Sequence, residues 1–425
     1  MRYFLFYQVD FILIDLYSFI HRKWNMTSKL LAANNTKLHY FLLLTLMVIG
    51  IIIRAVAIPY TNVDTHYYLI PWYDYIVSNG AIKALGDKFA NYTPPYTYLL
   101  ALMTLAPVSK IFAIKIIPIV MDVINCVIIY KIVRYKYSIG LAPAWATAIF
   151  WCLPSVILNS AWWGQADSFY TGFLLLTLYF LVSNRALLAM LFFSISVAFK
   201  LQAIFMGPLL AILFLGAMFK PSMFKSHFLS QTNRIKMGYF LIIPIIYALM
   251  CLPAVLLGRG WVDVWSIYLD QANTFKWLSA YAPNLYVFIS DQYFHPVSEL
   301  GLIFALIITL IWVGYTIKNA INFNADKLML TALTSVALVP FLLPKMHERY
   351  FYPADLISLL VAFYMPRLWF LPVGFQLVSC LSYYPVLSNT WAHTNVKYAA
   401  LINVVLIIFI VWKQSVSVKS TIDLV

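Results

Sequence analysis

The sequence predicts an all-α, polytopic integral membrane protein with about twelve transmembrane helices. Of its 425 residues, 63% are hydrophobic and only 10% are charged, whereas roughly 25% are charged in an ordinary soluble domain. A soluble chain of this length could not bury so much apolar side chain in one core. Apolar runs of about 17–25 residues, the length of a membrane-spanning helix, recur from Leu42 to Trp412. A helix satisfies its own backbone polar groups in lipid, which favours a helical bundle.

Hydropathy divides the chain into an N-terminal segment, 1–37, and one transmembrane domain, 38–425. The N-terminal segment is expected to be cytoplasmic or interfacial. Two long loops, 59–111 and 258–298, interrupt the domain on one side. The predicted spans are 39–58, 112–133, 141–158, 168–184, 186–200, 203–219, 238–257, 299–317, 328–343, 350–365, 368–384 and 398–412.

The positive charges indicate the orientation of these spans. The net charge is +14, and cytoplasmic loops of membrane proteins carry an excess of Lys and Arg. The short connections on the side opposite the two long loops hold most of the clustered basic residues. These are Arg22, Lys23, Lys29, Lys37, Lys131, Arg134, Lys136, Arg185, Lys220, Lys225, Arg234, Lys236, Lys318, Lys327, Arg367, Lys413 and Lys419. Both termini are therefore expected in the cytoplasm. The basic excess reflects this topology and not the binding of nucleic acid, and membrane lipid is an expected partner of the chain.

Two apolar segments are not counted as spans. Residues 94–108 form a run that is short for a span and suits an interfacial or re-entrant helix on the outer face. Counting this run as a span would invert every later one. Residues 3–20 contain Asp10 and Asp15 and suit an interfacial helix, a weak extra span, or an extension upstream of a start at Met26. No small-residue cleavage site follows them, so a cleaved signal peptide is not expected.

The cysteines predict no metal site. None of the four has the spacing of metal ligands, and all lie within or beside apolar spans. Small buried hydrophobic residues are therefore the better interpretation of Cys126, Cys152, Cys251 and Cys380.

The loop after the first span carries the first polar constellation, centred on Asp64. This carboxylate lies only a few residues beyond the span and could act as a general base at the membrane surface. The aromatic residues around it suit both the headgroup zone and sugar stacking. The alternative is a solvated loop acid within an aromatic belt. Asp74 is expected on the exposed face of a helix around 65–79.

Two further constellations follow in the chain. In the first, Asn91 and Tyr92 precede Pro94 and Pro95, which can begin a helix at its first turn and make a rigid hinge. In the second, the sequence Asn159-Ser-Ala-Trp-Trp163-Gly-Gln-Ala-Asp167-Ser168 lies at the outward end of the span 141–158. Gly permits a tight turn. The Gln amide and the Asp carboxylate suit contact with a hydroxyl group, with a water molecule bound to phosphate, or with a metal. Capping of the next helix by Asp167 and Ser168 is the alternative.

The fourth constellation combines Lys345, His347 and Arg349 between two apolar spans. Arg grips phosphate oxygens bidentately, and Lys and His add charge or a proton. The His-Glu pair is not a zinc motif, because no second His follows at i+4. The structural alternative is a cluster of side chains that snorkel to the membrane surface. Lys200, near Gln202, adds a weaker positive point on the same side.

The order of these motifs resembles the GT-C superfamily of polyprenyl-phosphate-sugar-dependent glycosyltransferases, closest to the bacterial mannosyltransferase-like family related to the second GPI mannosyltransferase. The resemblance runs from about residue 40 to 365 and implies a GT-C-like fold. Many relatives carry an Asp-x-Asp pair in the first loop, whereas the first position here is Asn62. The motifs that match are Asp64 with Pro71-Trp72-Tyr73, Asn91-Tyr-Thr-Pro-Pro-Tyr96, Trp163-Gly-Gln-Ala-Asp167-Ser168, Phe199-Lys200-Leu-Gln202 and Lys345-Met-His-Glu-Arg349-Tyr350.

The resemblance implies an inverting transfer of one sugar, mannose or another hexose, from a polyprenyl-phosphate donor to a glycan or lipid acceptor on the outer face. Asp64 would be the catalytic base. The donor phosphate would be bound by Arg349, His347, Lys345 and Lys200. The acceptor or a metal would be positioned by Asp167, Gln165, Trp163, Asn62 and Tyr92. Any divalent cofactor, Mg²⁺ or Mn²⁺, would be held by Asp64 and Asp167, and the loop 258–298 would form an acceptor lid with Trp261, Trp265, Trp277 and Tyr281.

Other classes of function stay open at this point. A lipid-linked sugar flippase or other transporter also needs interior polar residues, although no pair of broken helices marks a midplane site. An O-antigen-type polymerase or ligase would use a diphosphate carrier. A bacterial inner membrane with the site facing the periplasm fits the resemblance, and an endoplasmic-reticulum relative would have the same topology.

Overall fold

The computed structural model describes residues 36–419, apart from 225–227, 230–232, 275 and 391–392. The expectations for residues 1–35, including the apolar run 3–20, lie outside this part of the chain. The chain divides into two units, Met1–Ile49 and Gly50–Val425. In the first unit the described residues are the beginning of helix α2 (Thr36–Ala57). All that follows concerns the second unit, with residues 50–57 as the end of that helix.

Most described residues are helical, and eight helices are long and apolar enough to cross a membrane. The prediction of an all-α polytopic membrane protein is therefore confirmed. Several of the eight begin with a short 3₁₀ turn, labelled η, that continues into an α-helix. They are α2; α5 (Lys110–Lys136); η4 (Leu201–Met206) with α10 (Gly207–Phe219); η7 (Met237–Leu241) with α11 (Ile242–Leu256); η9 (Asp291–Tyr293) with α13 (Phe294–Asn319); α14 (Ala325–Leu342); η11 (Pro366–Leu368) with α16 (Phe370–Leu387); and α17 (His393–Lys419).

The other four predicted spans correspond to shorter or bent helices. The span 141–158 is α6 (Ala142–Trp151), followed after a 49° bend by α7 (Pro154–Ile157) and the π-helix η3 (Leu158–Trp163). The remaining three are α8 (Asp167–Val182), α9 (Ala186–Phe199) and α15 (Tyr352–Tyr364). These three are shorter than the roughly 20 residues of a typical span. The count of twelve spans therefore stays a prediction.

Helix α15 is short because it lies inside the bundle. All residues from Tyr352 to Val361 are buried, on every side of the helix. Burial of polar Asp355 and Ser358 on this helix is balanced by hydrogen bonds, including two from Ser379 Oγ to the Asp355 carboxylate (2.9 and 2.8 Å). A helix enclosed by protein has no lipid to match in length.

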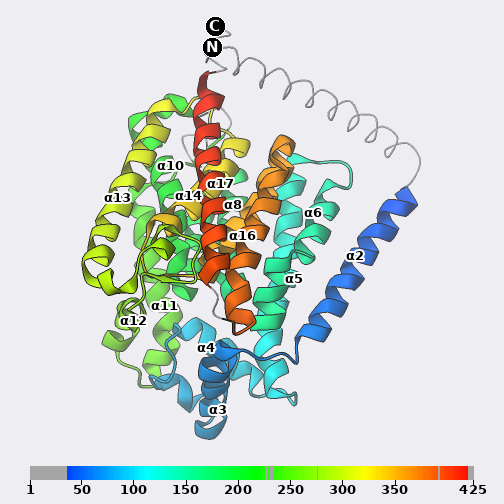
Figure 1. The fold of residues 1–425 in the computed structure, drawn as a ribbon, viewed down its shortest axis with the longest axis vertical. Coiled ribbons are helices and arrows are strands. Elements are labelled where there is room, and N and C mark those ends of the chain that lie inside the picture. The colour runs from blue at the N-terminus through cyan, green and yellow to red at the C-terminus, as the bar shows by residue number, and fades with distance from the viewer. Residues whose placement is uncertain (1–35, 225–227, 230–232, 275, 391–392, 420–425) are drawn as a thin grey trace. The chain divides into compact units, whose positions relative to one another are not determined.

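The first long loop folds into short helices at one end of the unit. These are η1 (Thr65–Leu69), α3 (Ile70–Asn79), η2 (Lys83–Gly86) and α4 (Pro94–Met103), with α3 and α4 together at the lower end of Figure 1. The helix around 65–79 agrees with the prediction, and Asp74 is half exposed and pairs with Lys110 (2.5 Å). Helix α4 begins at the two prolines, as expected. Its ten residues extend about 15 Å, too short to cross the hydrocarbon layer.

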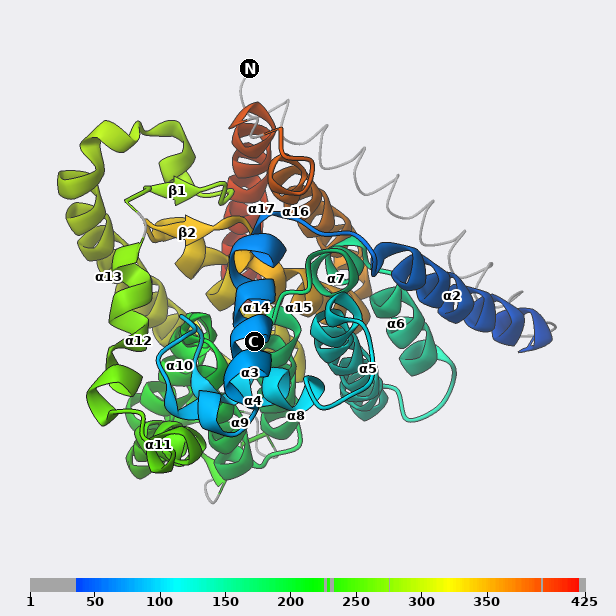
Figure 2. The ribbon, with the colours of Figure 1, turned by 90° about the horizontal axis from the view of Figure 1, so that it is seen from below.

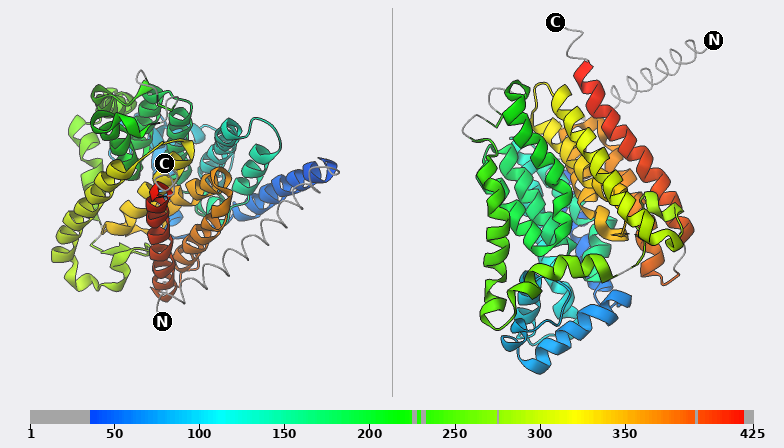
Figure 3. Two further views of the ribbon diagram at one scale, coloured as in Figure 1. Left: turned by 90° about the horizontal axis from the view of Figure 1, so that it is seen from above. Right: turned by 90° about the vertical axis from the view of Figure 1, so that its left-hand side faces the viewer.

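The second long loop covers the same end and is tied to the segment that carries Arg349. It contains α12 (Trp261–Thr274), β1 (Ser279–Ala280) and η8 (Leu285–Phe288). Strand β1 pairs in parallel with β2 (Met346–His347), next to each other in Figure 2. Helix α12 runs across the direction of the long helices (Figure 3, right). The loop 258–298 is thus packed against the fourth polar motif.

The basic connections gather at the other end of the unit. Lys110 begins α5 beside the first long loop, and Lys136 ends it about 40 Å away, where its ammonium pairs with Asp326 (2.7 Å). At this end Lys220 donates to the carbonyl of Lys318 (2.6 Å). Lys136, Lys220 and Lys318 therefore lie at the end of the bundle opposite to the first long loop. The orientation of the bundle in a membrane, and the side of both termini, stay predictions.

The four cysteines are free thiols in the structure. Cys126 and Cys251 are buried, and Cys152 and Cys380 are half-buried. All four lie in or beside the helices, as the sequence predicted.

Candidate functional site

One oxygen of Asp64 is the point where three distant segments meet. Asp64 Oδ2 accepts hydrogen bonds from Trp163 Nε1 (3.0 Å) and Gln165 Nε2 (2.8 Å). It also pairs with Arg349 Nη1 at 3.0 Å. The first, third and fourth polar motifs of the sequence therefore form one cluster, as the prediction of a common side required. Among the described residues, no hydrogen bond or ion pair reaches the other oxygen, Asp64 Oδ1.

Asn62 fixes the backbone around Asp64 from within the loop. Its side-chain oxygen accepts hydrogen bonds from Thr65 N (3.0 Å) and Thr65 Oγ1 (3.1 Å). This arrangement ties down the first turn after Asp64, in the way that Asn side chains favour helix starts. Asn62 was expected to position the acceptor or a metal, but the structure does not bring it to the cavity described below. The side-chain oxygen of Asn62 is already used by these two hydrogen bonds within its own loop.

A tight turn presents Trp163 and Gln165 to Asp64. The π-helix η3 ends at Trp163, and Gly164 has a φ of +79°, a conformation that glycine adopts without steric cost. Tyr92 Oη donates to Gln165 Oε1 (3.0 Å) and so orients the amide, leaving its nitrogen to face Asp64. Burial raises the pKa of Tyr92, which keeps this hydroxyl a donor.

Asp167 lies one layer deeper than Asp64 and is fully buried. One oxygen pairs with Lys200, and the other accepts from Asn159 Nδ2 (2.9 Å) and lies 3.6 Å from Arg349 Nε. The alternative of helix capping is wrong, because α8 begins at Asp167 without a side-chain cap. The carboxylate instead neutralises the two cations of the site.

Arg349 is surrounded by carboxylates and lies above an aromatic ring. Its Nη1 lies 2.8 Å from Glu348 Oε1 as well as 3.0 Å from Asp64, and its guanidinium is 5.3 Å from the centre of the Trp163 ring. Burial lowers the pKa of Arg349, but the neighbouring carboxylates, Asp64 foremost, outweigh it and raise this pKa well above the ordinary value. Burial likewise raises the pKa of Glu348, and Arg349 with His347 outweighs it, so this pKa is lowered. Both groups therefore stay charged.

Lys200 reaches the site through a cage of tyrosine rings. Its ammonium lies 5.6–5.7 Å from the ring centres of Tyr92, Tyr170 and Tyr350, a distance at which the face of an aromatic ring attracts a cation. The ion pair with Asp167 holds it there. Lys200 is therefore a fixed charge beside the Asp64–Arg349 pair.

A cavity of about 630 Å³ opens beside this cluster, within the range of ligand-binding pockets. Six of the predicted site residues line it, whereas Trp163 and Asp167 are fully buried behind them. The six are Asp64, Tyr92, Gln165, Lys200, His347 and Arg349.

Lys345 does not join this group, although the sequence placed it with Arg349. Its backbone has a φ of +62°, and its amide donates to the carbonyl of Leu278 (2.8 Å). The ammonium lies 3.5 Å from the Ala272 carbonyl and 5.1 Å from the ring centre of Phe294, and the residue does not line the cavity. The pairing of β1 with β2 turns this lysine away from the cluster.

The second long loop contributes half of its predicted lid residues to the cavity. Trp277 and Tyr281 line it, together with Gln271 and Thr274 at the end of α12. Trp261 and Trp265 are nearly half exposed elsewhere on α12. The loop therefore forms part of the cavity wall through Gln271, Thr274, Trp277 and Tyr281.

Two residues that hold the charged groups received no role from the sequence. Glu348 is 3% exposed and binds Arg349, and Asn159 is fully buried and binds Asp167. Both stand inside motifs that were recognised. The signal that could have identified them is general: a polar side chain within an apolar stretch needs a partner.

The carboxylates do not fit a metal held by both Asp64 and Asp167. Asp167 spends both oxygens on Lys200 and Asn159 and does not reach the cavity. Among the described residues, no group of three or more His, Cys, Asp or Glu side chains could hold a metal ion. Asp64 alone could serve as one ligand of an ion carried by a phosphate substrate.

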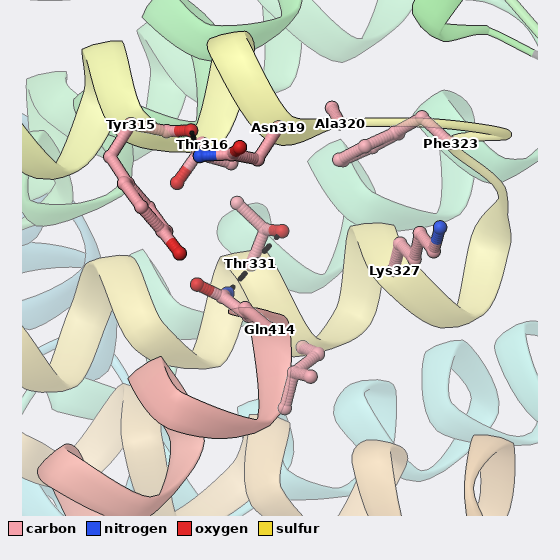
Figure 4. Close-up of a pocket in the computed structure, with 9 residues that line it drawn as sticks. Tyr315, Thr316, Asn319, Ala320, Phe323, Lys327, Thr331 and Gln414 are labelled. Carbon is pink, nitrogen blue, oxygen red and sulfur yellow. Dashed lines mark hydrogen bonds between the residues drawn. The ribbon is translucent and has the colours of Figure 1, made fainter. Parts of the chain in front are cut away.

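A second, much smaller cavity lies at the opposite end of the bundle (Figure 4). Its volume of about 40 Å³ suits a few water molecules. Its lining is mixed, with polar side chains from Thr316, Asn319, Lys327, Thr331 and Gln414. This cavity is too small for an organic substrate.

The four motifs and their geometry are the basis for any assignment of function to this chain. The motifs lie in one cluster beside the larger cavity. No family model matches the chain, and no curated protein is significantly similar to it.

Proposed function

We propose that this chain is an inverting glycosyltransferase of the GT-C type that moves a single sugar, mannose or another hexose, from a polyprenyl-phosphate donor to a glycan or lipid acceptor. One observation carries the proposal. A carboxylate, Asp64, and a guanidinium, Arg349, meet at 3.0 Å on the wall of a cavity of about 630 Å³, at one end of a membrane-protein helical bundle.

Arg349 supplies the charge that a phosphate leaving group needs. It lines the cavity with His347 and Lys200, and its fork of N–H groups matches phosphate oxygens. Charge that develops on the leaving oxygen is stabilised best by donors fixed in advance. The carboxylate of Glu348 on the cavity wall and that of Asp167 behind it hold the guanidinium in place.

Asp64 takes the proton of the acceptor hydroxyl. As that oxygen bonds to the anomeric carbon, the bond from this carbon to the phosphate oxygen breaks, and polyprenyl phosphate leaves with the electron pair. Attack opposite the leaving group inverts the sugar carbon. A donor phosphate also competes with Asp64 for Arg349, so binding of the donor weakens the ion pair that would hold the base inactive.

The aromatic lining suits a saccharide in the rest of the cavity. Tyr67, Trp72, Trp277 and Tyr281 line it, and flat rings pack against the C–H faces of sugars. The apolar helices around the site suit a lipid tail. In this proposal the cavity faces the periplasm from a bacterial inner membrane, with both termini in the cytoplasm.

The experiment compares Asp64→Asn with Asp74→Asn, a half-exposed acid of the same long loop. Purified protein is given a radiolabelled polyprenyl-monophosphate sugar and an extract of envelope glycans and lipids. We expect labelled acceptor and free polyprenyl phosphate from the wild type and from Asp74→Asn. Asp64→Asn should be slower by about 10²–10⁴-fold, the usual contribution of a general base.

The outcomes separate this proposal from its alternatives. Near wild-type transfer by Asp64→Asn removes Asp64 from the role of base. Movement of labelled lipid across liposomes without bond cleavage indicates a flippase. Transfer only from a diphosphate-linked oligosaccharide indicates a polymerase or ligase.

A further inference from the structure

Helix α5 carries buried charged side chains on one face. Lys115 and Asp122 are both 0% exposed and are separated by seven residues, two turns of helix, so they point to the same side. A charged side chain within an apolar span is costly and usually has a specific function. Neither residue lines the large cavity or contacts Asp64, Asp167 or Arg349 in the part of the chain that the structure describes.

Lys115 joins the ends of two segments. Its ammonium donates to the carbonyls of Ala57 (3.2 Å), Tyr60 and Trp162 (2.8 Å), which uses all three of its N–H donors. Ala57 is the last residue of α2, Tyr60 follows it by three residues, and Trp162 is at the end of η3. The Lys115 side chain therefore connects the segment at the end of α2 to the end of η3.

Gly164 rests directly on the stem of this lysine. A Cβ atom at Gly164 would lie 3.3 Å from Lys115 Cγ, so the tight turn before Gln165 is packed against α5. Tyr60 precedes Asp64 by four residues, and Trp162 directly precedes Trp163. The ends that Lys115 fastens are thus the ones that present Asp64 to Trp163 and Gln165.

Asp122 joins the same two segments farther from the site. Its Oδ2 pairs with Arg54 Nη2 (3.0 Å) and accepts a hydrogen bond from Ser160 Oγ (2.6 Å). Arg54 lies on α2 and Ser160 on η3. This contact is between opposite charges that neutralise each other, whereas Lys115 meets backbone carbonyls.

We propose that Lys115 is a positioning residue that sets the distance between Asp64 and the Trp163–Gln165 turn. Removal of the ammonium takes a hydrogen-bond donor away from three backbone carbonyls, although that of Ala57 still accepts from Tyr60 N (3.1 Å). Loss of a donor is unfavourable where the carbonyl is shielded from water. The two segments then relax apart, and the Asp64 carboxylate loses its alignment. The contacts of Asp122 with Arg54 and Ser160 remain, and they continue to hold α2 and η3 together farther from the site. The catalytic part of this inference rests on the proposed glycosyl transfer.

The test compares Lys115→Met with Lys131→Met, an exposed lysine at the far end of the same helix. We expect kcat to fall about 10- to 100-fold in Lys115→Met, as a displacement near 1 Å can do, with the KM for the donor within about twofold because no donor-binding group is removed. Hydrogen–deuterium exchange should become faster at residues 60–66 and 162–167 in this variant alone.

The exchange measurement needs no activity, so the two proposals fail separately. A wild-type protein that transfers no sugar ends the proposed function, while faster exchange in Lys115→Met still supports the positioning of the two segments. Unchanged exchange, or unchanged kcat in an active protein, overturns the role of Lys115. If Lys115→Met does not fold where Lys131→Met does, Lys115 supports the fold as a whole and the proposal is also overturned.

Discussion

Both ends of the helical bundle bring cations together, but the carboxylates that they meet differ in burial. At the far end, Lys136, Lys220 and Lys327 donate to backbone carbonyls at or near helix ends, those of Tyr364, Lys318 and Ile321. Lys136 also pairs with Asp326 (2.7 Å), whose side chain is 39% exposed. At the site end, Arg349 and Lys200 face the carboxylates of Asp64, Glu348 and Asp167. The cavity beside them is about 630 Å³, compared with about 40 Å³ at the far end.

The difference separates structural charge from functional charge. A cation at a helix C-terminus stabilises orphan carbonyls and the helix dipole, and nothing further need be bound. A buried cation between carboxylates is expensive to desolvate and weak evidence for stability. Its placement on a cavity wall is therefore better explained by a ligand than by the fold.

The strongest test of this difference is to remove a guanidinium from each end. We expect Arg349→Met to lower kcat by about 10²–10³-fold, the effect of losing one preorganised donor to a developing anion, while Arg367→Met at the far end has no such effect. Arg349→Lys, which keeps the charge but not the fork, should fall between them. Rates are measured per folded molecule, because three acids lose a partner. Equal losses at the two ends would contradict the distinction.

The loss of thermal stability at acid pH should depend on Glu348. Its pKa is lowered from the ordinary value of 4.5, so the stabilisation from this carboxylate is present above about that pH and is lost as pH falls through the lower folded value. We expect the thermal midpoint of the wild type to drop below about pH 4.5 more steeply than that of Glu348→Gln. The exposed acid Glu299, changed to Gln, is the control. Parallel profiles for all three proteins would show that Glu348 makes no charged contact.

The contact between the two long loops should matter less. Lys88 pairs with Asp263 (3.6 Å) and Asp270 (3.0 Å), and all three side chains are about half exposed. We expect Lys88→Ala to change the KM for the acceptor by only about twofold, and the change to vanish near 1 M salt, because exposed pairs are weak and screened. Lys83→Ala is the matched control. A large effect that persists at high salt would indicate direct contact with substrate.

The smallest effect is expected at the far cavity. Gln414 accepts from Trp312 Nε1 (3.1 Å) and donates to Thr334 Oγ1 (2.8 Å). Gln414→Leu should lower the free energy of unfolding by about 0.6 kcal/mol, typical of hydrogen bonds between membrane helices, and leave sugar transfer unchanged. The measurements are thermal unfolding and the transfer assay. A loss of transfer comparable with that of Arg349→Met would assign function to both ends.

Much of the architecture was predictable because hydropathy acts over short stretches of chain. Each of the twelve predicted spans overlaps at least one helix, and eight of them overlap a helix long and apolar enough to cross a membrane. The charge pattern grouped Lys136, Lys220 and Lys318 at one end. What hydropathy missed was tertiary in origin. The short length of α15 follows from its enclosure, and the break before Pro154 divides a predicted span into α6 and α7.

The site was predictable as a set of motifs but not as a set of contacts. Polar residues in an apolar chain identified Asp64, Gln165, Lys200 and Arg349 as candidates. The same reasoning included Lys345, because sequence distance cannot show that β1 and β2 turn it away.

The sequence by itself determined that the chain crosses a membrane repeatedly as helices and which polar motifs face the same side. Those properties depend on the composition and charge of short stretches of sequence. Each stretch has them wherever it lies in the fold. Only the tertiary structure decided that Asp64 Oδ2 receives Trp163, Gln165 and Arg349 together, that Asp167 lies behind the cavity, and that Lys115 fastens the segments. The contacts of Asp64 Oδ2 join residues separated by 99 to 285 positions, and those of Lys115 join residues separated by 47 to 58. Their geometry follows from how the helices pack.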